Sequence, residues 1–191
     1  MRSAFYAGHF GKAGFPAATG IGMDQGGVLI EFVAIRPGTA RTLPLDNPLQ
    51  ISAHAYSEKI LAGGVYTDKK TPKFERARYF ELFGKKLIFI SGTASIRGEK
   101  TVGIGDPAEQ TKVTIQNISR LYSPQMLSRI SKNNLQPKYG HARVYVKNPH
   151  DFPAIKKMFR RYFGRLPVVY LIADICREEL LVEIEGKVIL E

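Results

Sequence analysis

The sequence predicts an α+β domain in which helices pack on one face of a mixed sheet. Three observations support this fold class. Short runs rich in β-branched and aromatic residues, such as Leu87–Ile90, are typical of buried strands. Residues 151–163 have the apolar spacing of an amphipathic helix. Strand and helix patterns are mixed along the chain, and its 191 residues suffice to bury one core.

Residues 87–122 hold a strand, a glycine turn and a capped helix in succession. The strand over 87–90 stops at Ser91-Gly92, where the missing side chain lets backbone or a ligand come close. Nearby hydroxyls, among them that of Thr93, make this turn a candidate site rim. Asp106-Pro107 has the chemistry of a helix N-cap and first turn, which predicts a helix over 106–122.

The other elements follow from the same signals of periodicity, capping and turn residues. On the N-terminal side we expect a helix over 3–13, strands over 17–22, 28–35 and 50–56, and a connector over 36–48. On the C-terminal side we expect paired strands over 74–83 and 86–91, a short helix over 124–132, a strand over 143–147, a helix over 151–163, and strands over 168–172 and 180–184.

The start of the chain repeats a pattern found near its end. Phe10-Gly11, Pro16, Ile21 and Leu29-Ile30-Glu31 follow in the same order and nearly the same spacing as Phe163-Gly164, Pro167, Ile172 and Leu181-Val182-Glu183. We therefore expect residues 1–48 to hold the tail of a first module and a connector, and residues 49–191 to form a second module. Strands missing from the first module would leave an edge that another chain, or a reorganised N-terminus, covers.

Composition restricts the function without choosing one. No stretch reaches the length of about 20 apolar residues that a membrane span needs, and no signal-peptide pattern opens the chain, so we expect a cytoplasmic protein. The four histidines lack metal-ligand spacing, and no metal site is expected. A net charge of +11 fits a solvated basic face, a nucleic-acid surface or an anionic small-molecule substrate. Nucleic-acid binding is disfavoured because no binding motif or stacking platform accompanies the charge.

Glu183 and Glu185 lie two residues apart on a predicted strand, so both side chains leave the same face. If that face is enclosed, desolvation and mutual repulsion raise a carboxyl pKa and keep an acid protonated near neutral pH. The alternative is a pair of solvated edge carboxylates. Cys176, the one cysteine, also has two interpretations, a small buried apolar group or a site residue.

A set of motifs in the second module resembles the RidA (YjgF) superfamily. The motifs are Ser91-Gly92-Thr93, Gly105-Asp106, Gln110-Thr111, Asn117-Ile118, Val144-Tyr145-Val146, Phe163-Gly164 and Leu181-Val182-Glu183-Ile184-Glu185. They occur in the family's order, and the resemblance covers about residues 72–191. Two further motifs, Ala173-Asp174-Ile175-Cys176-Arg177 and Pro16-Ala17-Ala18-Thr19, resemble the chorismatase branch in particular.

The resemblance implies a RidA/chorismate-mutase-like sheet, with a partial copy of the same module at the N-terminus. It also implies a chorismatase-like reaction, in which pyruvate leaves chorismate and a hydroxybenzoate-type product forms. On this basis Glu183 is the expected general acid and Glu179 a supporting carboxylate. Cys176 together with Gly92 is similar to the branch that makes 3-hydroxybenzoate. No metal and no organic cofactor is implied.

Chorismate carries two carboxylates, so its site needs cations, and arginine can bind a carboxylate bidentately. The candidate arginines, which lie in or beside matched motifs, are Arg76, Arg143 and Arg177. Thr93 belongs to the same expected substrate-binding set, and Tyr66 and Tyr56 are candidates to line the ring.

The resemblance leaves alternatives open. Family chorismatases carry two modules in one longer chain, so this sequence resembles the C-terminal portion of that arrangement. A RidA-fold binding or regulatory protein without catalysis, assembled as a homotrimer with ligand sites between subunits, is the second hypothesis. Imine deamination is disfavoured because Val168-Val169 stands where RidA deaminases carry an arginine.

Overall fold

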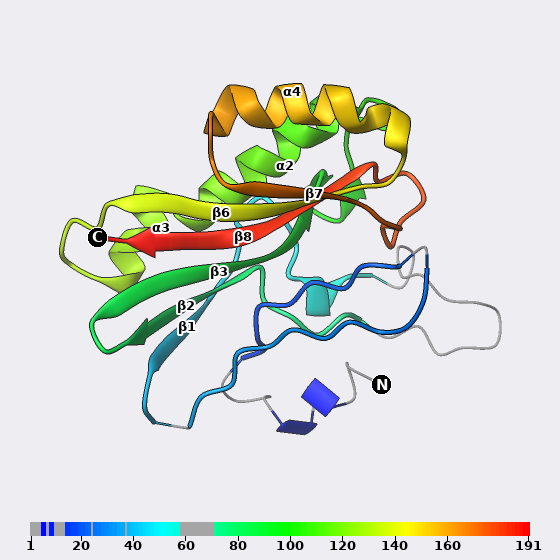
Figure 1. The fold of residues 1–191 in the computed structure, drawn as a ribbon. Coiled ribbons are helices and arrows are strands. Elements are labelled where there is room, and N and C mark those ends of the chain that lie inside the picture. The colour runs from blue at the N-terminus through cyan, green and yellow to red at the C-terminus, as the bar shows by residue number, and fades with distance from the viewer. Residues whose placement is uncertain (1–4, 7, 10–13, 24, 37, 58–70) are drawn as a thin grey trace.

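The structure, a computed structural model, describes residues 5, 6, 8, 9, 14–23, 25–36, 38–57 and 71–191. Its main feature is a mixed six-stranded sheet in the order β1-β2-β3-β8-β6-β7 (Figure 1). The strands in that order are Arg41–Leu45, Ala77–Leu82, Lys85–Ala94, Val182–Leu190, Pro137–Val146 and Val168–Ile172. Adjacent strands are antiparallel except β6 and β7, which run parallel. The predicted α+β class is confirmed.

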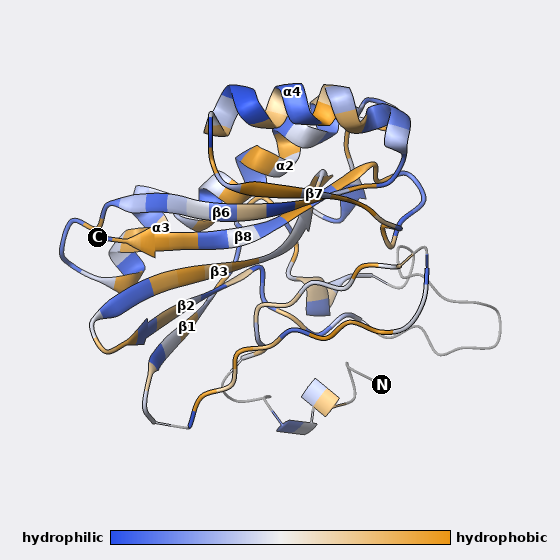
Figure 2. Cartoon of the chain, viewed as in Figure 1, coloured by the Kyte–Doolittle hydropathy of each residue, from blue (hydrophilic) through white to orange (hydrophobic). Residues whose placement is uncertain are grey.

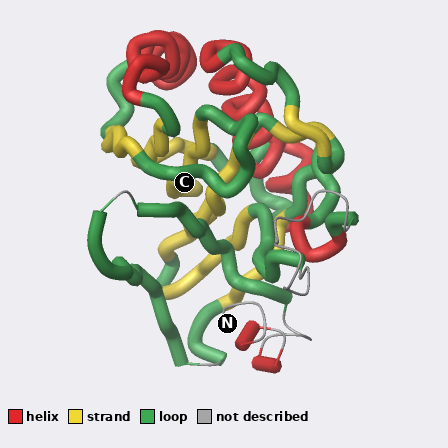
Figure 3. The backbone as a smooth tube through the Cα atoms, turned by 90° about the vertical axis from the view of Figure 1, so that its right-hand side faces the viewer, coloured by secondary structure: helices red, strands yellow, loops and turns green. Residues whose placement is uncertain are grey.

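Three helices lie on one side of this sheet. They are α2 (Pro107–Leu121), α3 (Pro124–Ile130) and α4 (Phe152–Phe163), and in the view of Figure 3 helices lie along the top and the right of the strands. Each helix mixes hydrophilic and hydrophobic residues, as expected when only one side is buried (Figure 2). The fully buried Ile118 of α2 and Phe159 of α4 pack in one core with Val144 and Ile184 of the sheet. The opposite face of the sheet is therefore the one left for a site.

The hairpin from β2 to β3 confirms the predicted strand pair. Phe83 and Gly84 form its two-residue turn, and both have positive φ angles, 49° and 73°. Such a turn matches the twist of the flanking strands and places Ala77 opposite Ile90. β3 then continues past the predicted stop, because the ladder with β8 shifts register between Ile90 and Thr93 and resumes. Gly92 therefore lies in a β-bulge rather than at a strand end.

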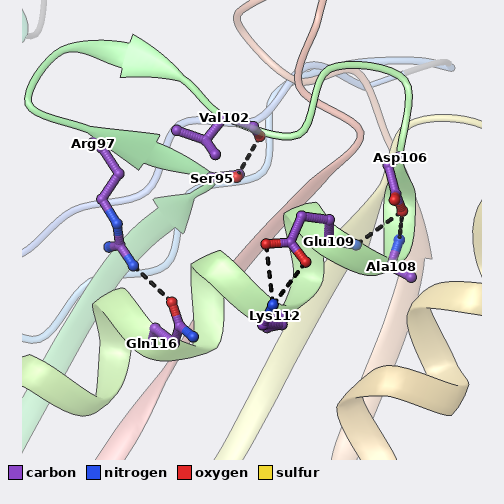
Figure 4. Close-up of polar contacts among 8 residues, drawn as sticks. All are labelled: Ser95, Arg97, Val102, Asp106, Ala108, Glu109, Lys112 and Gln116. Carbon is purple, nitrogen blue, oxygen red and sulfur yellow. Dashed lines mark hydrogen bonds and ion pairs between the residues drawn. The ribbon is translucent and has the colours of Figure 1, made fainter.

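The N-terminus of α2 is capped as the sequence predicts. The Asp106 carboxylate accepts hydrogen bonds from the backbone N–H groups of Ala108 and Glu109, each at 2.9 Å (Figure 4). A short hairpin of β4 (Ile96–Arg97) and β5 (Lys100–Thr101) lies beside this helix, and its Arg97 donates to the Gln116 side chain at 2.7 Å. The helix and the hairpin are thus joined by side-chain hydrogen bonds.

Asn117 fixes α2 to the backbone just after the bulge. Its amide nitrogen, fully buried, donates to the carbonyl oxygens of Ala94 and Ile96 at 3.0 and 2.9 Å. We expect Asn117→Ala to lower the free energy of unfolding by about 2 kcal/mol or more, because both buried carbonyls lose a partner. Chemical denaturation measures this change. Asn134→Ala, at an exposed position, is the control, and an equal loss in both variants would contradict the assignment.

Several predicted elements of the N-terminal part are wrong. Residues 28–35 are not a strand, and 17–22 contains only isolated bridges at Ala17 and Gly22, because no neighbouring strand pairs along either stretch within the described residues. Residues 50–56 include a 3-10 turn over Ala53–Ala55, closed locally by the bond from the Ala55 N–H to the Ser52 oxygen. The predicted helix over 3–13 lies largely outside the described residues.

The predicted connector over 36–48 is also wrong in part, because its residues 41–45 form β1 at the sheet edge. Pro44 has no N–H to donate, which an edge strand tolerates. β6 and β8 are longer than predicted, since their cross-strand pairs continue to Pro137 and Leu190. The division at residue 48 stays a prediction. Of the helices that the structure describes, none has the length and apolarity needed to cross a membrane.

Candidate active site

Glu183 lies on the face of the sheet opposite the helices. It pairs with Ala94 of β3 and Tyr145 of β6, while the neighbouring Val182 and Ile184 are fully buried in the core. Alternation along β8 therefore directs Glu183 to the other face, together with Glu185. The residue is only 7% exposed. The structure thus places a buried carboxyl group near the middle of the sheet. This agrees with the interpretation in which the face that carries Glu183 is enclosed, and not with a solvated edge carboxylate.

Gly92 makes room for this carboxyl group. A Cβ atom on Gly92 would lie 1.9 Å from Oε1 of Glu183 and 2.8 Å from Cγ2 of Thr19. The Gly92 N–H donates to Oγ1 of Thr19 at 2.8 Å, and the Ala18 N–H donates to Oγ of Ser91 at 3.0 Å. The bulge is therefore held by the N-terminal segment. The sequence did not predict the contact between Thr19 and Gly92. It showed only that the motif Pro16-Ala17-Ala18-Thr19 resembles the chorismatase branch.

Two arginines meet on one tyrosine ring. The Cζ atoms of Arg76 and Arg177 lie 5.3 and 5.2 Å from the ring centre of Tyr56, within cation–π distance. Arg76 is only 3% exposed; it donates to the Ile51 carbonyl oxygen at 2.8 Å and to the Tyr56 hydroxyl. Its Nε has no hydrogen-bond partner among the described residues. The two guanidinium groups together bring positive charge to this ring.

Arg76 adjoins the Gly92 bulge. The backbone oxygen of Arg76 accepts a hydrogen bond from the Ser91 N–H at 3.1 Å, and Arg177 follows Cys176 in the chain. The guanidinium of Arg177 also donates to the Glu99 carbonyl oxygen at 2.8 Å. Arg76 therefore lies beside the bulge, and Arg177 lies with it against the Tyr56 ring.

The third arginine is already paired. Arg143 donates to Oε1 of Glu185 at 2.9 Å and forms an ion pair with Glu31, and Tyr145 donates to the same Glu185 oxygen at 2.8 Å. The hydrogen bond to Glu185 is the main reason that the pKa of Arg143 is raised above its ordinary value. Arg143 thus links Glu185 and Glu31 on the open face of the sheet. The sequence did not predict these two acidic partners.

Glu179 and Thr93 make hydrogen bonds within the protein. The Thr101 hydroxyl donates to Oε1 of Glu179 at 2.8 Å, and backbone and Thr101 hydrogen bonds lower the pKa of Glu179. Thr93 pairs with Ile184, which places it on the helix-covered face, and its hydroxyl donates to the Ser91 oxygen at 2.8 Å. The structure therefore does not bring Thr93 to the open face. Tyr66 lies outside the described residues.

Cys176 reaches the surface beside Glu183. Desolvation, followed by the negative charge of Glu183, raises the pKa of the Cys176 thiol, and the positive charge of Arg177 offsets part of this effect. The thiol is therefore protonated near neutral pH.

The raised pKa predicts slow alkylation of Cys176. Only the thiolate reacts with iodoacetamide, so the reaction rate should rise with pH around a midpoint above the ordinary thiol value of about 8.5. Mass spectrometry can follow the reaction without ambiguity because the chain has one cysteine. Glu183→Gln removes one cause of the shift, and we expect a lower midpoint in that variant. Identical pH profiles would contradict the coupling between these two residues.

Comparison with solved structures shows the class of the fold. Yeast Mmf1 superposes with a TM-score of 0.50 at 14% identity, covering 78% of this chain and 98% of that one. A protein of Entamoeba histolytica that carries the name endoribonuclease L-PSP gives a TM-score of 0.50 at 16% identity, covering 78% and 99%. These likenesses concern the fold alone, and the fold is RidA-like.

Proteins named chorismatase and 3-hydroxybenzoate synthase are more similar in sequence. The chain is 34% identical over 181 residues to a 3-hydroxybenzoate synthase of Streptomyces hygroscopicus, covering 91% of this chain and 51% of that protein. A chorismatase of Streptomyces rapamycinicus is also 34% identical over 181 residues, covering 92% and 52%. A chorismatase crystal structure gives a TM-score of 0.71 at 30% identity, covering 91% and 51%. The chain is similar in sequence and fold to chorismatases over about half of their length.

Two facts qualify the comparison. No protein-family model matches the chain. The chain spans about half the length of the curated relatives it matches.

Proposed function

We propose that this chain acts as a chorismatase-like enzyme that releases pyruvate from chorismate and forms 3-hydroxybenzoate. The observation that carries the proposal is the contact between Glu183 and Gly92. A buried carboxyl group occupies the space that any side chain at residue 92 would fill. The similarity to a 3-hydroxybenzoate synthase supports the same product.

In the proposed reaction Glu183 donates a proton to the terminal methylene carbon of the enolpyruvyl group. The C4 hydroxyl oxygen then bonds to ring carbon C3 as the ether C3–O bond breaks, so the enolpyruvyl carbons and the ether oxygen leave as pyruvate and the hydroxyl proton restores the acid. The resulting 3,4-epoxide opens at its C4–O bond, the hydrogen on C3 moves to C4, and loss of one C4 hydrogen as a proton, balanced by protonation of the oxygen on C3, gives 3-hydroxybenzoate. Pyruvate and 3-hydroxybenzoate together contain the atoms of chorismate, so no net water is consumed. Positioned acids of this kind contribute about 100-fold to 10,000-fold to a rate.

Arg76 and Arg177 are the proposed partners of the substrate carboxylates. Both stack on Tyr56, and Arg76 has a donor without a partner among the described residues. Tyr56 keeps the two cations in fixed positions, which reduces the entropy lost when an anion binds. Arg143 has a different proposed role, because it is neutralised by Glu185 and Glu31 and so fixes the neighbouring strands.

The proposal is tested by incubating the purified chain with chorismate. Pyruvate is followed by its reduction with lactate dehydrogenase, and ring products are separated by chromatography. Equal amounts of pyruvate and 3-hydroxybenzoate are the expected result. A folded chain that binds chorismate and releases no pyruvate would overturn the proposal and support the non-catalytic RidA-fold binding protein.

A further inference from the structure

One stretch of the N-terminal part crosses from the start of β2 to the loop before β8. Ala17 forms a parallel bridge with Glu75, and Gly22 forms an antiparallel bridge with Asp174. The second bridge is closed by a hydrogen bond from the Gly22 N–H to the Asp174 carbonyl oxygen at 3.0 Å. Thr19 lies between the two bridges in the chain, so its place against the sheet is fixed from both directions.

The hydroxyl of Thr19 completes the hydrogen bonding of the Gly92 bulge. The register of β3 and β8 shifts between Ile90 and Thr93, so Gly92 has no pair in the described ladder with β8. The Gly92 N–H instead donates to Oγ1 of Thr19 at 2.8 Å. The acceptor for this backbone group therefore comes from outside the sheet.

A second contact beside the first holds the bulge to the same stretch. The Ser91 hydroxyl accepts a hydrogen bond from the Ala18 N–H at 3.0 Å and donates to the Glu75 carbonyl oxygen at 2.6 Å. Ala18 and Thr19 thus hold the consecutive residues Ser91 and Gly92. The Ser91 contact fixes where the two stretches meet, and the Thr19 contact fixes the direction of the Gly92 N–H.

Thr19 also faces the carboxyl group of Glu183. A Cβ atom on Gly92 would lie 2.8 Å from Cγ2 of Thr19 and 1.9 Å from Oε1 of Glu183. The methyl group and the carboxyl oxygen therefore border the same small space beside the bulge. If the Gly92 N–H lost its acceptor and the bulge turned, the space that holds the carboxyl group would change.

We propose that Thr19 is a positioning residue that acts through Gly92 to hold the Glu183 carboxyl group in place. The inference rests on the function proposed above, in which Glu183 is the acid. Thr19 transfers no proton itself. Its hydroxyl keeps the bulge, and with it one wall of the space around the acid, in a single geometry, and groups held in the reactive geometry react faster.

Two substitutions separate the hydroxyl from the rest of the side chain. Thr19→Val keeps the branched shape and removes the acceptor, whereas Thr19→Ser keeps the acceptor and removes the methyl group. Thr39→Val is the matched control, because Thr39 is exposed in the N-terminal part of the chain and its hydroxyl donates to the Arg36 carbonyl oxygen at 2.7 Å.

The contact is tested without substrate, by NMR measurement of amide hydrogen exchange at Gly92. Exchange is expected to be about 10-fold faster in Thr19→Val than in the wild type, because the N–H loses its acceptor. Thr19→Ser and Thr39→Val should exchange as the wild type does, and the Gly22 N–H should keep its rate throughout. Unchanged exchange at Gly92 in Thr19→Val would overturn the inference. Faster exchange at both glycines would overturn a role specific to the bulge.

The effect on the acid is tested by turnover of chorismate. In Thr19→Val we expect kcat to fall about 10-fold with KM close to that of the wild type, since Ser91 still holds the bulge and the misplacement is smaller than 1 Å. Thr19→Ser should restore most of the rate. A rise in KM alone, or an equal loss of kcat in Thr19→Ser, would overturn the positioning role. A wild-type chain that releases no pyruvate would overturn the proposed function instead, and exchange at Gly92 would then decide whether Thr19 holds the bulge.

Discussion

Glu183→Gln is expected to reduce pyruvate release from chorismate by at least about 100-fold, the lower limit for losing a positioned general acid. Glutamine keeps the size and shape of the side chain, so it still fits against Gly92, but its amide cannot transfer a proton to carbon. Binding of chorismate should change little. The loss should therefore be in kcat, with KM close to that of the wild type.

The control is Glu178→Gln, which changes an exposed carboxylate in the loop that precedes β8. Circular dichroism and thermal unfolding establish that both variants fold. Near wild-type turnover in Glu183→Gln would remove the proposed acid from the mechanism. An equal loss in both variants would indicate an effect of charge on the whole region rather than a role for Glu183.

Gly92→Ala is expected to reduce turnover by about 100-fold, because a misplacement of about 1 Å at a reacting group has this effect. The new Cβ would lie 1.9 Å from Oε1 of Glu183, so the carboxyl group or the bulge must move. Overpacking of this kind also costs about 1–3 kcal/mol of stability. Turnover and chemical denaturation are measured on the same preparation.

Gly8→Ala is the matched control, since a Cβ at Gly8 meets nothing within 4 Å. It should leave turnover and the unfolding midpoint unchanged. If Gly92→Ala is as active as the wild type, the close approach between the bulge and Glu183 does not position the acid.

The elements predicted best are those that depend on local sequence. Asp106 caps α2 through bonds to residues two and three positions ahead, and the two-residue turn at Phe83-Gly84 fixes the β2–β3 hairpin. Residues 28–35 show the limit of this approach. Their apolar pattern is that of a strand, but a strand also needs a partner, and pairing partners are set by distant parts of the chain.

In the candidate site, too, the features set by local sequence were predicted and those set by distant parts of the chain were not. Alternation along β8 was enough to place Glu183 and Glu185 on one face, away from the core. The meeting of Arg76 and Arg177 on Tyr56 joins three distant parts of the chain, and no local pattern predicts it. The pairing of Arg143 with Glu185 depends on strand register, which sequence spacing does not give.

The most direct test of the central claim is to run the reaction in heavy water. The acidic proton of Glu183 exchanges with solvent, so pyruvate should carry one deuterium in its methyl group. Immediate reduction by lactate dehydrogenase traps this label as lactate for mass spectrometry. The account predicts singly labelled lactate from the wild-type chain and none above background from Glu183→Gln. Unlabelled lactate from the wild type, or the same labelled yield from the variant, would contradict it.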